Sequence, residues 1–468
     1  MGKSRHLVLF PFMAEGHVIP FIALARHFAK RSHCAITLLI TPSMSHKLKP
    51  TFPLDSEVRL VELPFTGAER GLPLLQAAET LRPAFKDFIS NLCAEAGRDS
   101  ICVIADFLAA WSIKVAKDLG VCVYVFMTSG AYGSAVGFSV RLHLPHSKTD
   151  CEQFPVPEFP RPLRLSRSQL PDNLRLADGT DGLTLFLRRQ FSTCFTSDGF
   201  LFNTIEGLED IGMQYFEKKS GRPVWAVGPI ISTSNQDRPE GVRRHECLEW
   251  LNLHPPSSVL YIAFGSTATI SASQMVDLAH GLEASGKPFI WVVKSPVGYQ
   301  GNEEFREEWL PEGFEDRIKK TKQGILVRNW GPQVAILAHK STSAFLSHCG
   351  WNSVLESLAH GVPIIAWPLM SEQFFNAKML VEEAKVSVQI AAGNSSKIDP
   401  AHVSAVIETV MGATEKGEEV RRNARKIREM MHAAVKEKTG FEGSSIKALD
   451  DLVVTAFSVK KTRNEEIH

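Results

Sequence analysis

The stretch of residues 330–373 constrains the fold more than any other part of the chain. Its pattern of apolar and turn-forming residues predicts a short helix, a buried strand over residues 344–346, a polar turn, a helix over residues 354–360 and a second buried strand. Strands that alternate with helices are typical of a parallel sheet covered by helices on both faces. In such a fold the end of a strand leads into the start of a helix, and ligands bind at that edge of the sheet.

The same alternation recurs in both halves of the chain, which at 468 residues is too long for one ordinary core. We therefore predict an α/β protein with two doubly wound domains, residues 1–231 and 246–445, and a ligand-binding cleft between them. The polar residues 232–245 are expected to form the linker, and residues 446–468 a C-terminal helix and tail that packs back on the first domain. The predicted strands cover residues 6–10, 35–40, 58–63, 101–105, 121–126, 199–202 and 224–227 in the first half, and 258–264, 288–293 and 324–327 in the second.

Composition favours a small-molecule partner. The net charge is +1 and no long basic tract occurs, which argues against a protein that binds nucleic acid by neutralising phosphates. No apolar stretch reaches the length of a membrane span, and the apolar run at residues 7–12 is too short for a signal peptide. The eight cysteines contain no CxxC pair, so reduced thiols are expected. These features predict a cytoplasmic protein without a membrane span, and we also expect a monomer.

The polar turn at residues 348–353 suits an anion. Backbone N–H groups at the start of a helix have no partner within the helix, and Asn352 and Ser353 add side-chain donors, so we expect a phosphate here. A simpler alternative stays open, because Ser353 and Glu356 have the spacing of a capping box that serves only the helix itself.

A second turn of small residues, 265–267, follows an earlier predicted strand, and two such turns fit a diphosphate better than a monophosphate. A plain turn is the alternative. Ser271 and Gln274 predict a capping box for the helix that comes next. Trp330 follows the predicted strand 324–327 and could stack on a flat base, although a tryptophan in the core is the usual case.

Several common motifs are absent from the sequence. There is no GxGxxG after the first strand, no GxxxxGK[ST] and no GxSxG, so a nicotinamide dehydrogenase, a P-loop NTPase and an α/β hydrolase lose their main support. No Asp-x-Asp occurs, so a metal clamp on a diphosphate has no obvious ligands. We therefore expect helix ends and neutral donors to stabilise the diphosphate.

His17 and Asp106 form a candidate acid–base pair. His17 lies in the predicted turn after the first strand, and Asp106 ends the strand at residues 101–105, at the same edge of the same sheet. A helix start disfavours the imidazolium, so a neutral ring could accept a proton while the carboxylate orients it. A solvent-exposed or capping histidine is the simpler alternative.

Residues 330–373 closely resemble the donor-binding signature of the plant secondary-product glycosyltransferases, the UDP-sugar-dependent small-molecule family. The resemblance includes HCGWNSxLES at residues 348–357 and the closing Gln373. Further matches extend over nearly the whole chain: GHVIP at 16–20, Asp106, NT at 203–204, VGP at 227–229, CLEWL at 247–251 and SVLYIAFGS at 258–266.

The resemblance implies a GT-B fold of two facing Rossmann-like domains, with the acceptor bound mainly by the first and the UDP-sugar by the second. It implies that Trp330 stacks on uracil, that the backbone near Gln333 meets the edge of the base, and that Glu356 holds the ribose hydroxyls. Contacts to the diphosphate are implied for His348, Asn352, Ser353 and Ser266, and contacts to the sugar for Trp351, Glu372, Gln373 and Thr128.

The same resemblance points to glucose as the sugar, because a closing Gln goes most often with UDP-glucose and Trp351 offers no cation for a glucuronate. Glu372 departs from the more frequent Asp. UDP-glucose is then a cosubstrate, and no bound cofactor or metal is expected.

The implied reaction is a single inverting displacement in which His17 deprotonates the acceptor hydroxyl and Asp106 stabilises the imidazolium. Phe12, Phe107 and Phe374 are candidate acceptor-pocket residues because they adjoin motif residues. A flavonoid or other phenolic acceptor is expected first and a terpenoid second. Three rival functions remain: C-glycosylation of a phenolic ring, a sugar-nucleotide epimerase or other transferase, and a non-catalytic UDP-sugar-binding protein.

Overall fold

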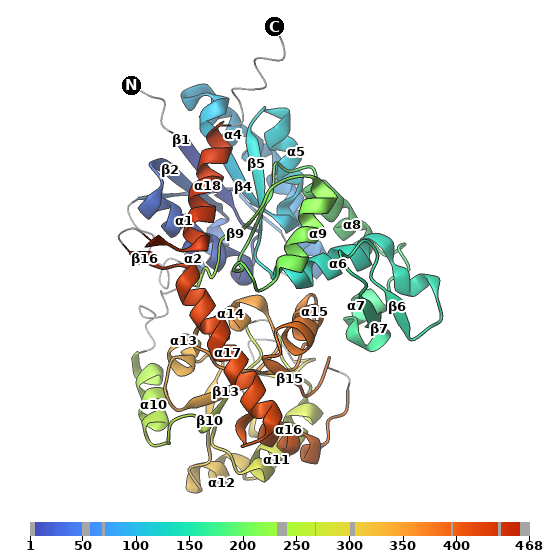
Figure 1. Ribbon diagram of the computed structural model, residues 1–468, viewed down its shortest axis with the longest axis vertical. Helices are drawn as coiled ribbons and strands as arrows, with labels where there is room; N and C mark the ends of the chain where they lie inside the picture. The colour runs from blue at the N-terminus through green and yellow to red at the C-terminus, as the bar shows by residue number, and fades with distance from the viewer. Residues whose placement is uncertain are drawn as a thin grey trace. The chain divides into compact units, whose positions relative to one another are not determined.

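The computed structural model describes residues 5–48, 57–67, 71–231, 241–266, 268–299, 305–394, 396–438 and 441–458. The chain divides into two compact units (Figure 1). Unit 1 comprises Met1–Leu165, Leu176–Arg238 and Ala433–His468, and unit 2 comprises Ser166–Arg175 and Pro239–His432. Residues 232–240 of the expected linker lie outside the described residues, and residues 241–245 already belong to helix α10 (Gly241–Asn252).

Unit 1 is built on a seven-stranded parallel sheet in the order β3-β2-β1-β4-β5-β8-β9. Each strand lies within one residue of its predicted range, because continuous apolar runs of this length form strands buried on both faces. The strands are β1 (Arg5–Phe10), β2 (Cys34–Ile40), β3 (Val58–Glu62), β4 (Ile101–Asp106), β5 (Cys122–Met127), β8 (Phe200–Phe202) and β9 (Val224–Ala226).

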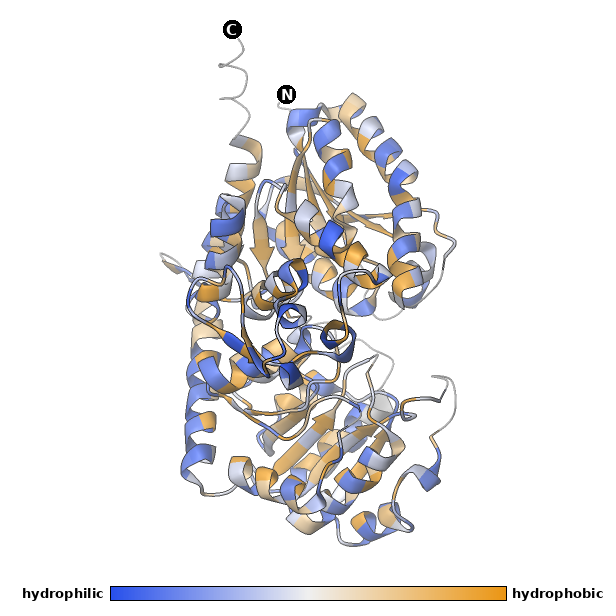
Figure 2. Cartoon of the chain, turned by 90° about the vertical axis from the view of Figure 1, so that its right-hand side faces the viewer, coloured by the Kyte–Doolittle hydropathy of each residue, from blue (hydrophilic) through white to orange (hydrophobic). Residues whose placement is uncertain are grey.

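Helices cover this sheet, and Figure 2 shows largely hydrophobic strands beside helices in which hydrophilic and hydrophobic residues alternate. The longer helices are α1 (Glu15–Arg31), α4 (Arg82–Ala96), α5 (Trp111–Asp118), α6 (Ala131–His143), α8 (Gly182–Cys194), α9 (Asp210–Ser220) and α18 (Ser444–Ser458). The C-terminal helix α18 contributes Leu449 and Leu452 to the buried cluster that contains Leu7 of β1. It is therefore part of the core of unit 1.

The segment between α6 and α8 contains a small two-stranded sheet of β6 (Gln153–Pro155) and β7 (Arg164–Ser166). Short helical turns flank it at η4 (Pro145–Lys148), η5 (Arg167–Gln169) and α7 (Asp172–Arg175).

Unit 2 is built on a six-stranded parallel sheet in the order β12-β11-β10-β13-β14-β15. Sequence patterns did not indicate β15, which is only three residues long and ends in an exposed glutamine. The strands are β10 (Val259–Ala263), β11 (Phe289–Val293), β12 (Gly324–Arg328), β13 (Thr342–Ser347), β14 (Ile364–Ala366) and β15 (Ser387–Gln389).

Two helix starts in unit 2 test the capping predictions. Ser271 and Gln274 form the predicted capping box at the start of α11 (Ala272–Ser285). Helix α14 (Trp351–Ala359) begins three residues before the predicted position, with Gly350 as its N-cap and no side-chain cap. The remaining helices are α12 (Phe314–Lys320), α13 (Gln333–Leu337), α15 (Gln373–Lys378), α16 (Pro400–Met411) and α17 (Glu415–Ala434).

Candidate functional site

His17 and Asp106 meet in unit 1. Strand β1 leads into α1, and β1 pairs directly with β4, so the start of α1 and the end of β4 share one edge of the sheet. Nδ1 of His17 lies 2.8 Å from Oδ2 of Asp106. The aspartate side chain has no exposed surface and that of the histidine is 20% exposed. His17 lies in the first turn of α1 rather than in the preceding turn, because the helix already begins at Glu15.

The Asp106 carboxylate is held on both sides. Its Oδ1 accepts a hydrogen bond from the backbone N–H of Leu108 at 2.9 Å, which caps the 3-10 turn η3 (Phe107–Ala109). One oxygen is thus fixed by the backbone, and the other is directed at the histidine. A carboxylate placed in this way sets both the orientation and the tautomer of the ring.

Thr128 follows β5, and its Oγ1 lies 3.2 Å from Nδ1 of His17. The resemblance implied a contact between Thr128 and the sugar. In the structure this threonine belongs to the environment of the histidine in unit 1, and its sugar contact stays a prediction.

Aromatic side chains surround the histidine. The ring centroids of Phe12 and Phe107 each lie 5.6 Å from that of His17. The ring of Phe107 also contacts that of Phe138 of α6, with centroids 6.3 Å apart. Phe138 in turn stacks on Phe191 of α8, with centroids 3.7 Å apart. Phe12 is buried and Phe107 half-buried, so this group forms an apolar wall beside the His17–Asp106 pair.

The predicted diphosphate turns converge in unit 2. Strand β10 pairs with β11 on one side and with β13 on the other, so the turns after these three strands lie at one edge of the sheet. A Cβ added to Gly265 would lie 2.4 Å from Nε2 of His348, and a Cβ added to Gly350 would lie equally close. The imidazole of His348 therefore fits only because Gly265 and Gly350 have no side chain.

His348 is a buried neutral donor in this cradle. Its exposed fraction is 8%, and burial, assisted by the charge of Lys294, lowers its pKa to about 4. Its Nδ1 is sealed from solvent and has no hydrogen-bond partner among the described residues. An imidazole that stays neutral at physiological pH can donate N–H to an anionic oxygen.

Lys294 is a candidate site residue that sequence reasoning missed. It directly follows β11, and its Nζ donates a hydrogen bond to the backbone oxygen of Gly265. An ammonium group therefore lies beside the turn at Gly265, in addition to the neutral donors that the sequence predicts. Its place just after an apolar strand, equivalent to that of His348 after β13, is the signal that could have identified it.

Gln333 links the residues expected to hold the nucleoside. Its Nε2 donates to the hydroxyl of Ser353 at 3.0 Å and to Oε2 of Glu356 at 2.7 Å. The hydroxyl of Tyr261 donates to its Oε1 at 3.3 Å. Ser353 and Glu356 do not form a capping box, since α14 begins before them.

Gln373 is also preorganised. It is buried, and its Oε1 accepts from the backbone N–H groups of Leu369 and Met370, each at 3.0 Å. Its side-chain nitrogen is thus the atom that can donate to a ligand. Glu372, which precedes it as the N-cap of α15, is half-buried.

The other predicted residues also lie in unit 2. Trp351 and Phe374 are buried, Trp330 and Asn352 half-buried, and Ser266 exposed. The structure therefore divides the predicted residues into two groups: His17, Asp106, Thr128, Phe12 and Phe107 in unit 1, and Trp330, Gln333, His348, Trp351, Asn352, Ser353, Glu356, Glu372, Gln373, Phe374 and Ser266 in unit 2.

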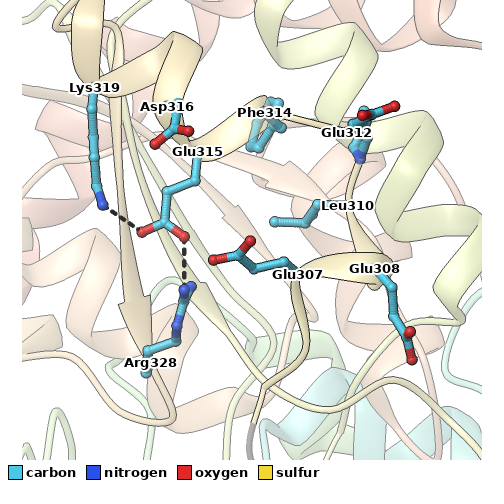
Figure 3. A pocket seen from close by; sticks show the side chains of 11 residues that line it. Glu307, Glu308, Leu310, Glu312, Phe314, Glu315, Asp316, Lys319 and Arg328 are labelled. Atoms are coloured by element: carbon cyan, nitrogen blue, oxygen red, sulfur yellow. Dashed lines mark hydrogen bonds and ion pairs between the residues drawn. The ribbon is translucent and has the colours of Figure 1, made fainter.

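A separate pocket of about 590 Å³ in unit 2 is shown in Figure 3. Acidic side chains dominate its lining, and Glu315 is paired with Lys319 at 2.9 Å and with Arg328 at 2.7 Å. None of the predicted site residues lines it.

Two kinds of feature are absent from the described ranges. No helix there combines the length and apolarity that crossing a membrane requires. No group of three or more His, Cys, Asp or Glu side chains there is placed to hold a metal ion.

Comparison with known proteins agrees with this geometry. The family described as UDP-glucoronosyl and UDP-glucosyl transferase matches residues 240–420. UDP-glycosyltransferase 92A1 of Arabidopsis thaliana is 39% identical, over 99% of both chains. UDP-glucose flavonoid 3-O-glucosyltransferase 7 of Fragaria ananassa is 32% identical, over 83% of this chain and 82% of its own.

Among solved structures, UGT2 of Phytolacca americana in complex with UDP-2fluoro-glucose and pterostilbene is 29% identical, with a TM-score of 0.80. The alignment covers 97% of this chain and all of that one. This likeness confirms the predicted α/β fold of the GT-B type. Two Rossmann-like sheets, a His–Asp pair at the edge of one and two glycines packed around His348 at the edge of the other, agree with relatives aligned over nearly the whole length: this chain belongs to the plant secondary-product UDP-glycosyltransferases, enzymes that transfer a sugar from a UDP-sugar to a small molecule.

Proposed function

We propose that this enzyme transfers glucose from UDP-glucose to a hydroxyl of a small hydrophobic acceptor, with inversion at the anomeric carbon and without a metal ion. The observation that carries the proposal is the 2.8 Å contact between His17 Nδ1 and the buried Asp106 carboxylate. A flavonoid or other phenolic is the preferred acceptor class and a terpenoid the second.

His17 acts as the general base. With a proton on Nδ1 held by Asp106, the lone pair of the ring lies on Nε2, which can accept the proton of the acceptor hydroxyl. The imidazolium formed in this step is stabilised by the carboxylate. The acceptor oxygen then attacks the anomeric carbon opposite the departing UDP, so an α-linked donor yields a β-glucoside.

Unit 2 holds the leaving group. The diphosphate is contacted by His348, by Ser266 and by the first turn of α14 with Asn352 and Ser353, where backbone N–H groups and the helix dipole favour negative charge. Lys294 adds a full positive charge at the same cradle. Charge that develops on the departing UDP is thereby stabilised by groups already in place, without reorganisation.

The nucleoside and the sugar occupy the rest of unit 2. Trp330 stacks on uracil, and Glu356, oriented by Gln333, accepts hydrogen bonds from the ribose hydroxyls. Glu372 and Gln373 bind the glucose hydroxyls, and Trp351 and Thr128 are the further residues proposed to contact the sugar. Residue types at Gln373 and Trp351 support glucose over a glucuronate, which would need a cation.

The residues proposed to line the acceptor pocket are Phe12, Phe107 and Phe374. Their apolar surfaces suit a flat hydrophobic ring system. The name of the Fragaria ananassa relative, a flavonoid 3-O-glucosyltransferase, supports the same acceptor class.

A product assay tests this function. Purified protein is incubated with UDP-glucose and a panel of phenolic and terpenoid alcohols, and products are analysed by mass spectrometry and by the anomeric coupling constant in NMR. We expect β-O-glucosides in the presence of EDTA, loss of transfer in His17→Ala, and UDP binding retained in that variant.

Other results would point to the rival functions. An acid-resistant product indicates C-glycosylation, and donor conversion without acceptor indicates an epimerase. UDP binding without any product across the panel indicates a binding protein.

A further inference from the structure

Arg141 is a buried cation that forms no hydrogen bond or ion pair with any described residue. It lies near the end of α6, and only 7% of its surface is exposed. Its Nη1 is sealed from solvent without a hydrogen bond, and no described residue forms a hydrogen bond or an ion pair with the guanidinium. Burial lowers its pKa to about 10, against the opposing effect of the Asp181 carboxylate. Buried charges are normally paired, so this arrangement needs an explanation.

The Asp181 carboxylate does not supply the missing partner. It is the N-cap of α8, and its Oδ1 accepts from the backbone N–H of Thr184 at 2.8 Å. The hydroxyl of Thr184 is itself buried and has no hydrogen-bond partner in the part of the chain that the structure describes. Among the described residues, one buried donor near the end of α6 and one near the start of α8 therefore have no hydrogen-bond partner. Buried donors of this kind call for an acceptor, and an anion would supply one to the guanidinium.

Arg141 shares a face of α6 with an aromatic residue that is linked by ring contacts to His17. Phe138, three residues earlier and hence on the same helix face, contacts Phe107, which in turn contacts His17. Helix α6 begins three residues after Thr128, and the helical rise places Arg141 about 15 Å along the axis from Ala131. An elongated molecule could therefore reach both His17 and Arg141.

We propose that Arg141 binds a carboxylate at the far end of the acceptor, so that the natural acceptor is an elongated hydroxy acid. This inference rests on the proposed glucosyl transfer. A guanidinium presents parallel N–H donors that match the two oxygens of a carboxylate, which explains why an arginine rather than a lysine would serve here.

Matched acceptors and a charge-removing variant test the proposal. Elongated phenolic and terpenoid hydroxy acids are compared with their methyl esters in the wild type, in Arg141→Met and in Arg141→Lys. Methionine fills a similar volume without charge, and replacement of a buried ion by an apolar side chain is usually tolerated. Arg222, an exposed arginine of unit 1, supplies the control variant Arg222→Met.

We expect the wild type to prefer the acid over the ester by about tenfold or more in kcat/KM, mainly through KM, since a charge-assisted pair is worth about 1.5–3 kcal/mol. Arg141→Met should lose this preference, Arg141→Lys should keep part of it, and Arg222→Met should keep all of it. An equal acid-to-ester ratio in the wild type and Arg141→Met overturns the proposal.

Calorimetry without donor separates this inference from the proposed function. If no acceptor is glucosylated, tighter binding of the acid than of the ester, lost in Arg141→Met, still supports the carboxylate site while transfer fails. If acetate or inorganic phosphate alone stabilises the wild type as strongly as the hydroxy acid does, the site takes a free anion and the acceptor assignment is overturned.

Discussion

Nε2 of His348 lies in space that a Cβ on Gly265 would enter, at a separation of 2.4 Å. Gly265 also has a φ of +77°, which side chains other than glycine rarely adopt. Two independent features therefore require glycine at position 265: its positive φ, and the imidazole of His348, which lies 83 positions later in the sequence.

Gly265→Ala should weaken UDP binding, because the imidazole must leave its position in the cradle. We expect about a tenfold to hundredfold loss of UDP affinity by calorimetry. Gly286→Ala is the matched control, since Gly286 has a φ of +62° but nothing within 4 Å of an added Cβ. Equal losses in both variants would show that backbone strain, and not displacement of His348, causes the effect.

Asp106→Asn should impair catalysis while leaving donor binding intact. The Asn oxygen can still accept from Leu108, but its NH₂ then faces Nδ1 of His17 and favours the tautomer whose Nε2 carries the proton. We expect kcat to fall by about 10²- to 10⁴-fold, measured by product formation with the best acceptor. A change in UDP affinity as large as the change in kcat would contradict this assignment.

Lys294→Met should reduce turnover by removing the cation at the diphosphate cradle. A charge-assisted hydrogen bond is worth about 1.5–3 kcal/mol, so kcat/KM for UDP-glucose should fall by roughly 10- to 100-fold. Lys294→Arg should retain more activity than Lys294→Met. The exposed Lys340 gives the control Lys340→Met, which should behave as wild type; unchanged kinetics in Lys294→Met would remove this lysine from the mechanism.

Glu209 should make the stability of the protein depend on pH. It is 1% exposed and accepts from the backbone N–H of Tyr132 at the start of α6. Burial raises its pKa from 4.5 to about 7, so the folded state binds this proton more tightly than the unfolded chain does. The stability that it contributes is therefore present below pH 4.5 and is lost as the pH rises through about 7.

Glu209→Gln keeps an acceptor for Tyr132 and cannot ionise, so it should be more stable than the wild type at pH 8, by on the order of 3 kcal/mol, and similar to it at pH 4.5. Denaturant unfolding across this range provides the measurement. Parallel stability curves for both proteins would mean that Glu209 does not titrate as proposed.

Most of the fold could be predicted from local patterns. The strands of unit 1 were placed within one residue because apolar runs between turn residues are a local property. The sequence pattern does not predict the short strand β15, and it predicts the start of α14 three residues too late. The first has too few buried residues to form a pattern, and the second begins at a glycine N-cap without the side-chain signal that located α11.

Local sequence patterns predict the alternation of strands and helices, the positions of His17, Gly265 and His348 shortly after apolar strands, and the motifs of the family. Which strand ends come together depends on the order of the strands in each sheet. His17 and Asp106 are 89 residues apart and come together because β1 pairs with β4. Lys294 joins the cradle because β10 lies between β11 and β13. Strand order is a property of the whole packed sheet, which no local run of residues encodes.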